Sequence, residues 1–162
     1  MKLIEKIDSF FLGCNKSKLV LLPLFLCISI SLLSALCFVI FFDESNSAIY
    51  QDKLTIRLFI TSVIIAPPLE TLIFQHIPYF FLKKIISNYH ITSLIIGVLF
   101  GFIHFFNEQN FFEVFTISLI GIIYAYIYII AYKRDNTYPF LITALIHCMY
   151  NFFVFLLKFL NQ

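Results

Sequence analysis

Residues 54–82 read LTIRLFITSVIIAPPLETLIFQHIPYFFL, and this predominantly apolar run decides how the chain can fold. A transmembrane helix needs about 20 consecutive apolar residues, so the run is long enough to span a bilayer. As one straight helix at about 1.5 Å per residue it would extend about 43 Å, against a hydrocarbon core of about 30 Å. Pro67 and Pro68 each lack a backbone N–H. We therefore expect them to break the helix just before Glu70, which would lie in the first turn of a new helix.

Further apolar runs occupy about residues 19–42, 91–106, 111–132 and 139–160. The chain of 162 residues is 61% hydrophobic and 12% charged, and its mean hydropathy is +0.96. An ordinary soluble domain carries about 25% charged residues, so a water-soluble fold of this size would leave too much apolar surface exposed. The sequence predicts an all-α fold, a polytopic bundle of about five transmembrane helices in the lipid bilayer.

The charged residues between the apolar runs alternate in sign. Basic residues precede the first run and follow the second and fourth, and acidic residues follow the first and third; they are Lys2, Lys6, Lys16, Lys18, Lys83, Lys84, Lys133 and Arg134, and Asp43, Glu44 and Glu108. Because basic loops face the cytoplasm, we expect a multi-pass protein of the cell membrane with a cytoplasmic N-terminus. The expected parts are a cytoplasmic segment (1–18), a first transmembrane helix with an outer loop (19–53) and a four-helix membrane domain (54–162). A net charge of only +2 argues against nucleic acid as a partner.

Two ionisable side chains deep inside these runs need an explanation. Glu70 is the only acidic residue deep in any run, and an acid at mid-bilayer is unfavourable by about 2.5–3.5 kcal/mol. His104 follows Gly97 and Gly101 on one helical face, and small residues at this spacing permit close helix packing. We therefore expect His104 to point into the protein and away from lipid.

The last apolar run carries two more polar groups, His147 and Asn151, one helical turn apart. Counted from the cytoplasmic ends of their runs, Glu70, His104, His147 and Asn151 all lie about 12–20 Å deep. Each residue alone is compatible with a hydrogen bond between helices. Polar groups from three runs at one depth instead predict a single polar site inside the membrane. The remaining histidines, which we interpret as non-catalytic, are His76 and His90.

The segment Ala66–Gln75, APPLETLIFQ, resembles the first motif of the CPBP proteins, which reads Glu-Glu-x-x-x-Arg and usually follows Ala-Pro. This family includes the type 2 CAAX prenyl endopeptidases, the lysostaphin resistance protein A-like proteins and bacteriocin-immunity membrane proteins. Its second motif, Phe-x-x-x-His, is matched by Phe100 and His104, and its third, His-x-x-x-Asn, by His147 and Asn151. The three motifs occur in the family's order, and the resemblance covers about residues 55–160.

The first motif departs from the family pattern at two supporting positions. Thr71 stands where the second Glu is usual, and Gln75 stands where Arg is usual. The two positions are four apart and share a helical face, so a Glu and an Arg there would be able to pair. Losing one partner would strand a buried charge at a cost of several kcal/mol. Here both charges are replaced together by neutral hydrogen-bonding groups, and Glu70 is kept.

The resemblance implies a metal-independent glutamate endopeptidase that needs no cofactor. Glu70 would act as general base on a water, and His104 would help to orient that water. His147 and Asn151 would donate hydrogen bonds to the oxyanion of the tetrahedral intermediate. The implied partner is a membrane-associated protein or peptide substrate, and prenylation of that substrate is implied by only part of the family.

Two other interpretations use the same residues. Glu70, His104 and His147 resemble the ligand set of a His2Glu zinc protease, although the compact His-Glu-x-x-His spacing is absent. Alternatively, the chain is a catalytically degenerate scaffold or bacteriocin-immunity protein in which the polar cluster holds helices together, and the changes at Thr71 and Gln75 favour this. A transporter fits less well, because five runs offer no repeated halves.

Overall fold

The computed structural model describes residues 2–41, 54–108, 111–134 and 138–160, and the regular elements in these ranges are helical. The predicted all-α fold is therefore confirmed. The outer loop expected before residue 54, with Asp43 and Glu44, lies outside the described residues. The elements are α1 (Lys2–Gly13), α2 (Lys16–Phe41), α3 (Ile56–Phe59), η2 (Ile60–Ile65), α4 (Ala66–Glu70), η3 (Thr71–His76), α5 (Ile77–Leu82), α6 (Tyr89–Glu108), α7 (Phe111–Lys133) and α8 (Pro139–Leu160).

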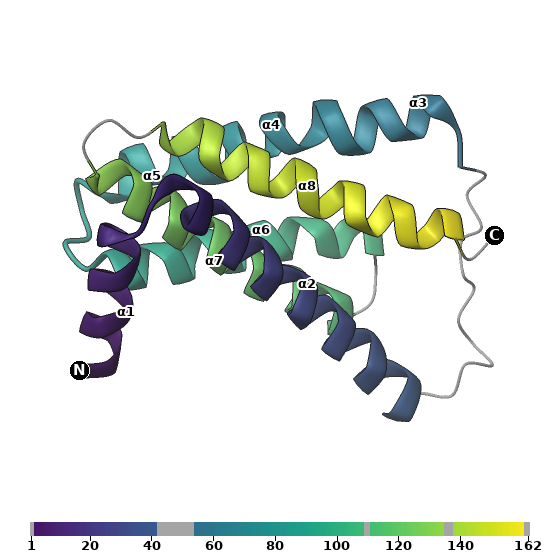
Figure 1. Cartoon of the computed structure of the whole chain (residues 1–162), viewed down its shortest axis with the longest axis horizontal. Coiled ribbons are helices and arrows are strands. Elements are labelled where there is room, and N and C mark those ends of the chain that lie inside the picture. Colours follow the sequence, from purple (N-terminus) through teal and green to yellow (C-terminus); the bar gives the residue numbers. More distant parts are fainter. Residues whose placement is uncertain (1, 42–53, 109–110, 135–137, 161–162) are drawn as a thin grey trace.

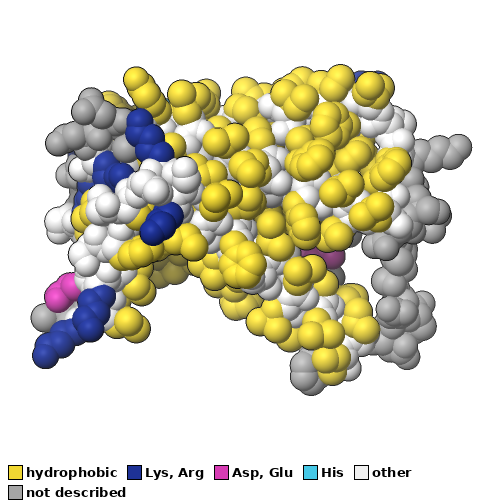
Figure 2. All heavy atoms as spheres, in the orientation of Figure 1, with side chains coloured by type: hydrophobic (Ala, Val, Ile, Leu, Met, Phe, Trp, Pro, Cys, Tyr) yellow, Lys and Arg dark blue, Asp and Glu magenta, His cyan; other side chains and the backbone are white. Residues whose placement is uncertain are grey.

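The apolar segments of the described chain match the predicted runs closely. Four are long and apolar enough to cross a membrane, and α6 contributes a shorter apolar helix; the four are Lys16–Ile40, Ile56–Leu82, Phe111–Lys133 and Pro139–Leu160. Hydrophobic side chains cover most of the face shown in Figure 2, and Lys and Arg side chains gather at the end where α1 lies. The protein is thus a multi-pass membrane bundle.

The second span is one continuous helical rod, so the expected break at Pro67 and Pro68 is wrong. Two π-helical segments, η2 and η3, lie on either side of α4. The Ala66 N–H donates to the carbonyl oxygen of Thr61, five residues back, instead of the usual four. This wider turn absorbs the prolines without interrupting the rod. Glu70 consequently ends α4 in mid-rod and does not open a new helix.

The helix α7 forms the centre of the bundle. Its buried residues Ile120, Tyr124, Ile127 and Ile130 pack in one core cluster with residues of α2 and α8. Figure 1 shows α8, α6 and the α3–α5 rod running roughly along the long axis and α2 running obliquely to them, while α1 crosses that direction at one end. Helices α2, α6 and α8 all contact α7, and the α3–α5 rod contacts it through η3. Helix α7 therefore supports every element that carries a candidate site residue.

Close contact between α6 and α7 depends on glycine. A Cβ added to Gly97 would lie 2.3 Å from the backbone nitrogen of Ile122, and one added to Gly101 would lie 1.9 Å from the Ser118 Oγ. On the facing helix, a Cβ on Gly121 would lie 2.8 Å from the Phe100 ring. The close packing predicted from the spacing of Gly97 and Gly101 is therefore confirmed, and it fixes α6, the helix of His104, against α7.

We expect Gly97→Ala to lower the free energy of unfolding by about 1–3 kcal/mol, because the new methyl group meets backbone that cannot move aside. Reversible unfolding in mixed micelles, followed by circular dichroism, measures this change. Gly13→Ala is the matched control, since a Cβ there meets nothing within 4 Å. Equal stability of the two variants would contradict the close α6–α7 contact.

Candidate active site

Glu70 and His147 meet between the α3–α5 rod and α8. The His147 Nε2 lies 3.5 Å from the Glu70 Oε2, within ion-pair distance. His147 is buried, whereas 27% of the Glu70 side chain is exposed. The helices α4 and α8 pack directly on each other, and this packing brings the Glu70 and His147 side chains together. The carboxylate is thus held by a buried imidazole and still reachable from the surface of the bundle.

His104 approaches the same pair from α6. Its Nδ1 lies 2.8 Å from the carbonyl oxygen of Phe100, one turn back along the helix. A carbonyl can only accept, so Nδ1 carries a proton and donates it. In the neutral ring Nε2 is then left as an acceptor. The rings of His104 and His147 both contact the ring of Phe100, so α6 joins α8 and the rod at one polar centre.

Phe100 is the apolar centre around which these residues are arranged. Its side chain is buried, and its ring lies 4.6 Å from the His104 ring and 5.9 Å from the His147 ring, centroid to centroid. Phe74, from η3, makes an edge contact with it at 5.7 Å. The phenylalanine of the Phe-x-x-x-His pattern therefore touches both histidines and fixes their separation by packing.

Asn151 lies one turn beyond His147 and joins α8 to the first π-helical segment. Its Nδ2 donates to the carbonyl oxygen of Ser62 at 2.8 Å. The residue five positions after Ser62 is Pro67, which has no N–H, and the N–H of Ala66 is given to Thr61. Asn151 thus supplies the donor that the proline lacks. The second hydrogen of its amide remains available for another acceptor.

Residues 52–153 of the chain match the model of the family described as type II CAAX prenyl endopeptidase, Rce1-like. The chain belongs to this Rce1-like family. The match includes Glu70, His104, His147 and Asn151, so the resemblance inferred from the three motifs is confirmed at the level of the family. Comparison with curated proteins and with solved structures gave no match.

In this Rce1-like chain, Thr71 and Gln75 are completely buried beside the site. The Thr71 Oγ1 and both polar atoms of the Gln75 side chain have no hydrogen-bond partner among the described residues. An unmatched Glu or Arg at either position would be a buried charge without a partner, which costs more than a neutral group. The neutral pair is therefore consistent with the surroundings that the structure gives it.

Tyr124 is a site neighbour that sequence reasoning missed. It is buried on α7, and its ring lies 4.8 Å from that of His147 at an interplanar angle of 36°. The Tyr124 hydroxyl, the Thr143 Oγ1 and the His147 Nδ1 have no hydrogen-bond partner in the described part of the chain. Because buried polar atoms are normally hydrogen-bonded, these groups are available to a bound water or a peptide group. The sequence did not indicate this role, because Tyr124 is one of several tyrosines within an apolar run.

The remaining histidines lie elsewhere. His76 Nδ1 is hydrogen-bonded to the hydroxyl of Tyr128, and His90 contacts Asp8 of α1. Across the described residues, no group of three or more His, Cys, Asp or Glu side chains is arranged to hold a metal ion.

We expect Asn151→Leu to lower the free energy of unfolding by about 1–3 kcal/mol, because the Ser62 carbonyl loses its donor. Adding Pro67→Ala restores an N–H five residues after Ser62 and should recover part of that loss. A double-mutant cycle in micelles measures the coupling. The control cycle uses Pro68→Ala, whose N–H is six residues from Ser62. Equal coupling in both cycles would show that Asn151 does not replace the missing donor.

Proposed function

We propose that this protein is an intramembrane endopeptidase that hydrolyses a peptide bond of a membrane-associated protein or peptide. The observation that carries the proposal is the 3.5 Å contact between the Glu70 carboxylate and the buried His147 imidazole inside a membrane bundle of the Rce1-like family. Burying an acidic side chain in the middle of the membrane costs free energy, so an acid placed beside two histidines there indicates a functional role. General base catalysis on a water is the use that fits this set of groups.

In the proposed mechanism, the Glu70 carboxylate takes a proton from a water whose oxygen attacks the scissile carbonyl carbon. The acceptor nitrogen of His104, Nε2, helps to orient that water. His147 and the second N–H of Asn151 donate to the oxyanion of the tetrahedral intermediate. When the intermediate collapses, Glu70 returns the proton to the leaving nitrogen. The products are one new carboxyl terminus and one new amino terminus, and no metal or cofactor takes part.

The surroundings of Glu70 favour a substrate that arrives through the membrane. Leu69 and Ile73 flank the site on the same rod and are about half exposed, at 51% and 50%. The exposed part of the Glu70 side chain therefore lies on a rod whose neighbouring side chains suit lipid or apolar substrate segments. The proposal covers prenylated and unmodified substrates alike.

We expect Glu70→Gln, His104→Ala and His147→Ala each to reduce cleavage by about 10²-fold or more while the protein remains abundant. Mass spectrometry of membrane proteins and released peptides, compared between wild-type cells and each variant, identifies the termini that disappear. Residues that act as a unit are not additive, so Glu70→Gln with His147→Ala should be no worse than either change alone. His76→Phe, outside the site, is the control and should leave every cleavage in place.

The second candidate function is a scaffold or immunity protein without catalysis. The neutral pair Thr71 and Gln75, whose polar side-chain atoms have no hydrogen-bond partner among the described residues, favours it. A scaffold would lose function gradually, in proportion to the amount of folded protein. Unchanged termini in the Glu70→Gln strain, together with normal abundance, would exclude the endopeptidase and leave the scaffold.

We also propose that the protein resides in the cell membrane with its N-terminus in the cytoplasm, on the basis of its basic loops. After the four native cysteines are replaced, Lys84→Cys should resist an impermeant thiol reagent added to intact cells, and Asn46→Cys should react. Both positions should react once the cells are opened. Labelling of position 84 alone in intact cells would reverse the orientation.

A further inference from the structure

The N-terminal helix α1 is amphipathic, and its apolar side chains are not covered by the bundle. Leu3, Ile7 and Phe10 lie on one face of the helix and are 70%, 42% and 47% exposed. Lys2 and Lys6 are exposed on the adjoining face. Apolar surface next to lysines on a short helix is typical of helices that lie in a membrane interface.

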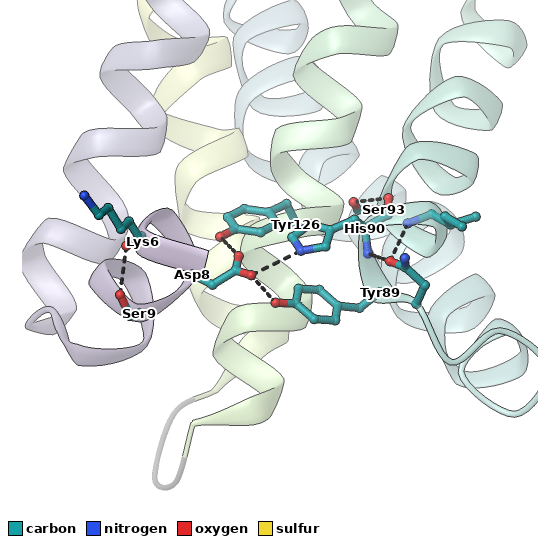
Figure 3. Close-up of polar contacts among 9 residues, drawn as sticks. Lys6, Asp8, Ser9, Tyr89, His90, Ser93 and Tyr126 are labelled. Atoms are coloured by element: carbon teal, nitrogen blue, oxygen red, sulfur yellow. Dashed lines mark hydrogen bonds and ion pairs between the residues drawn. The ribbon is translucent and has the colours of Figure 1, made fainter. Parts of the chain in front are cut away.

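A third side of α1 is fixed to the bundle by one carboxylate. Asp8 accepts hydrogen bonds from the Tyr126 hydroxyl at 2.7 Å and from the Tyr89 hydroxyl, and its Oδ2 lies 3.1 Å from the His90 Nε2 (Figure 3). Burial acts to raise the pKa of the Asp8 carboxyl, but the hydrogen bonds from Tyr126 and Tyr89 and the charge of His90 outweigh it. The pKa is therefore held below its ordinary value, which favours the charged form.

Arg134 secures the end of the same helix. Its guanidinium donates to the carbonyl oxygens of Phe11 at 2.9 Å and Cys14 at 2.6 Å. The ring of Phe11 also makes an edge contact with Tyr126 at 6.0 Å. These contacts hold α1 across the end of the bundle, at a steep angle to the other helices (Figure 1). The exposed apolar face is therefore presented in a fixed direction.

Chain continuity sets the level of α1 relative to the membrane. Helix α1 ends at Gly13, and the apolar span of α2 begins at Lys16. The exposed Lys16 and Lys18 join Lys2 and Lys6 at this end of the molecule, where Figure 2 shows the basic side chains collected. An apolar face on a helix that ends within three residues of a transmembrane span lies at the lipid surface.

We propose that α1 lies in the headgroup region of an anionic lipid leaflet, with Leu3, Ile7 and Phe10 inserted among the acyl chains and the lysines at the lipid phosphates. The contact with Asp8 fixes the roll of the helix, so the apolar face and the basic face address the membrane together. Anionic lipid is the occupant that suits both faces, because exposed lysines near a leaflet are attracted to its negative surface. This inference does not depend on the proposed peptidase activity.

The chain contains no tryptophan, so one introduced residue reports on one position. We would reconstitute the full chain carrying Phe10→Trp, or Ser9→Trp on the polar side of α1, into phosphatidylcholine vesicles with and without phosphatidylglycerol. Quenching by lipids with brominated acyl chains reports insertion, and quenching by aqueous iodide reports exposure to water. Position 10 should be quenched by the brominated chains about twofold or more better than position 9, and the difference should grow with phosphatidylglycerol.

Adding Lys2→Glu and Lys6→Glu to the Phe10→Trp variant should remove the dependence on phosphatidylglycerol. Each of the following results would overturn the proposal. Equal bromine quenching at positions 9 and 10, or iodide access to position 10, would show that the face is not inserted. Protection of position 10 from both quenchers would indicate a protein partner, such as a second copy of the chain. Insertion that is the same in both kinds of vesicle would rule out the preference for anionic lipid.

Discussion

Hydrocarbon offers no hydrogen-bond partner, so each polar group of a membrane-spanning segment must find one within the protein or remain unsatisfied at a cost. The Ala-Pro-Pro sequence before Glu70 makes this constraint severe, because two successive residues have no N–H to give. Two hydrogen bonds compensate for the missing donors. The Ala66 N–H donates to the carbonyl oxygen of Thr61, five residues back, and the Asn151 side chain donates to the carbonyl oxygen of Ser62. The Asn151 contact also joins the rod to α8, the helix on which His147 lies beside Glu70.

Asn151 therefore stabilises the packing of the rod on α8, independently of any contact with a substrate. Its amide has two hydrogens, and only one is given to Ser62. In the proposed mechanism the same residue would hold the rod in place and stabilise an oxyanion, because the first bond orients the second donor. Such double use suits a small membrane site, where every additional polar side chain has its own cost of insertion.

The sequence predicted the helices well because length and hydropathy are almost sufficient in a membrane. The polar residues were also found, since a Glu or His inside an apolar run is conspicuous, and the glycine spacing before His104 indicated close packing. The form of the second span was not found: two prolines indicate a break, and no local signal distinguishes a break from a π-helical turn. The Asp8 contacts were missed because their partners lie more than 80 residues away in sequence. The roles of the site residues in catalysis stay a prediction.

The π-helical segment η2 also affects how the chain tolerates changes in length. A segment of this kind holds about one more residue per turn than an α-helix, and each residue rotates a helix by about 100°. Removing one residue from Ile60–Ile65 would convert the wide turn to an ordinary one, and the two ends of the rod would keep nearly the same orientation relative to each other. The ring contact of Phe59 on α3 with Phe155 on α8 would then be preserved. A deletion in a regular α-helical part of the chain, such as α7, would instead rotate one end of the helix by about 100°. We therefore expect η2 to tolerate the loss of one residue better than the α-helices do.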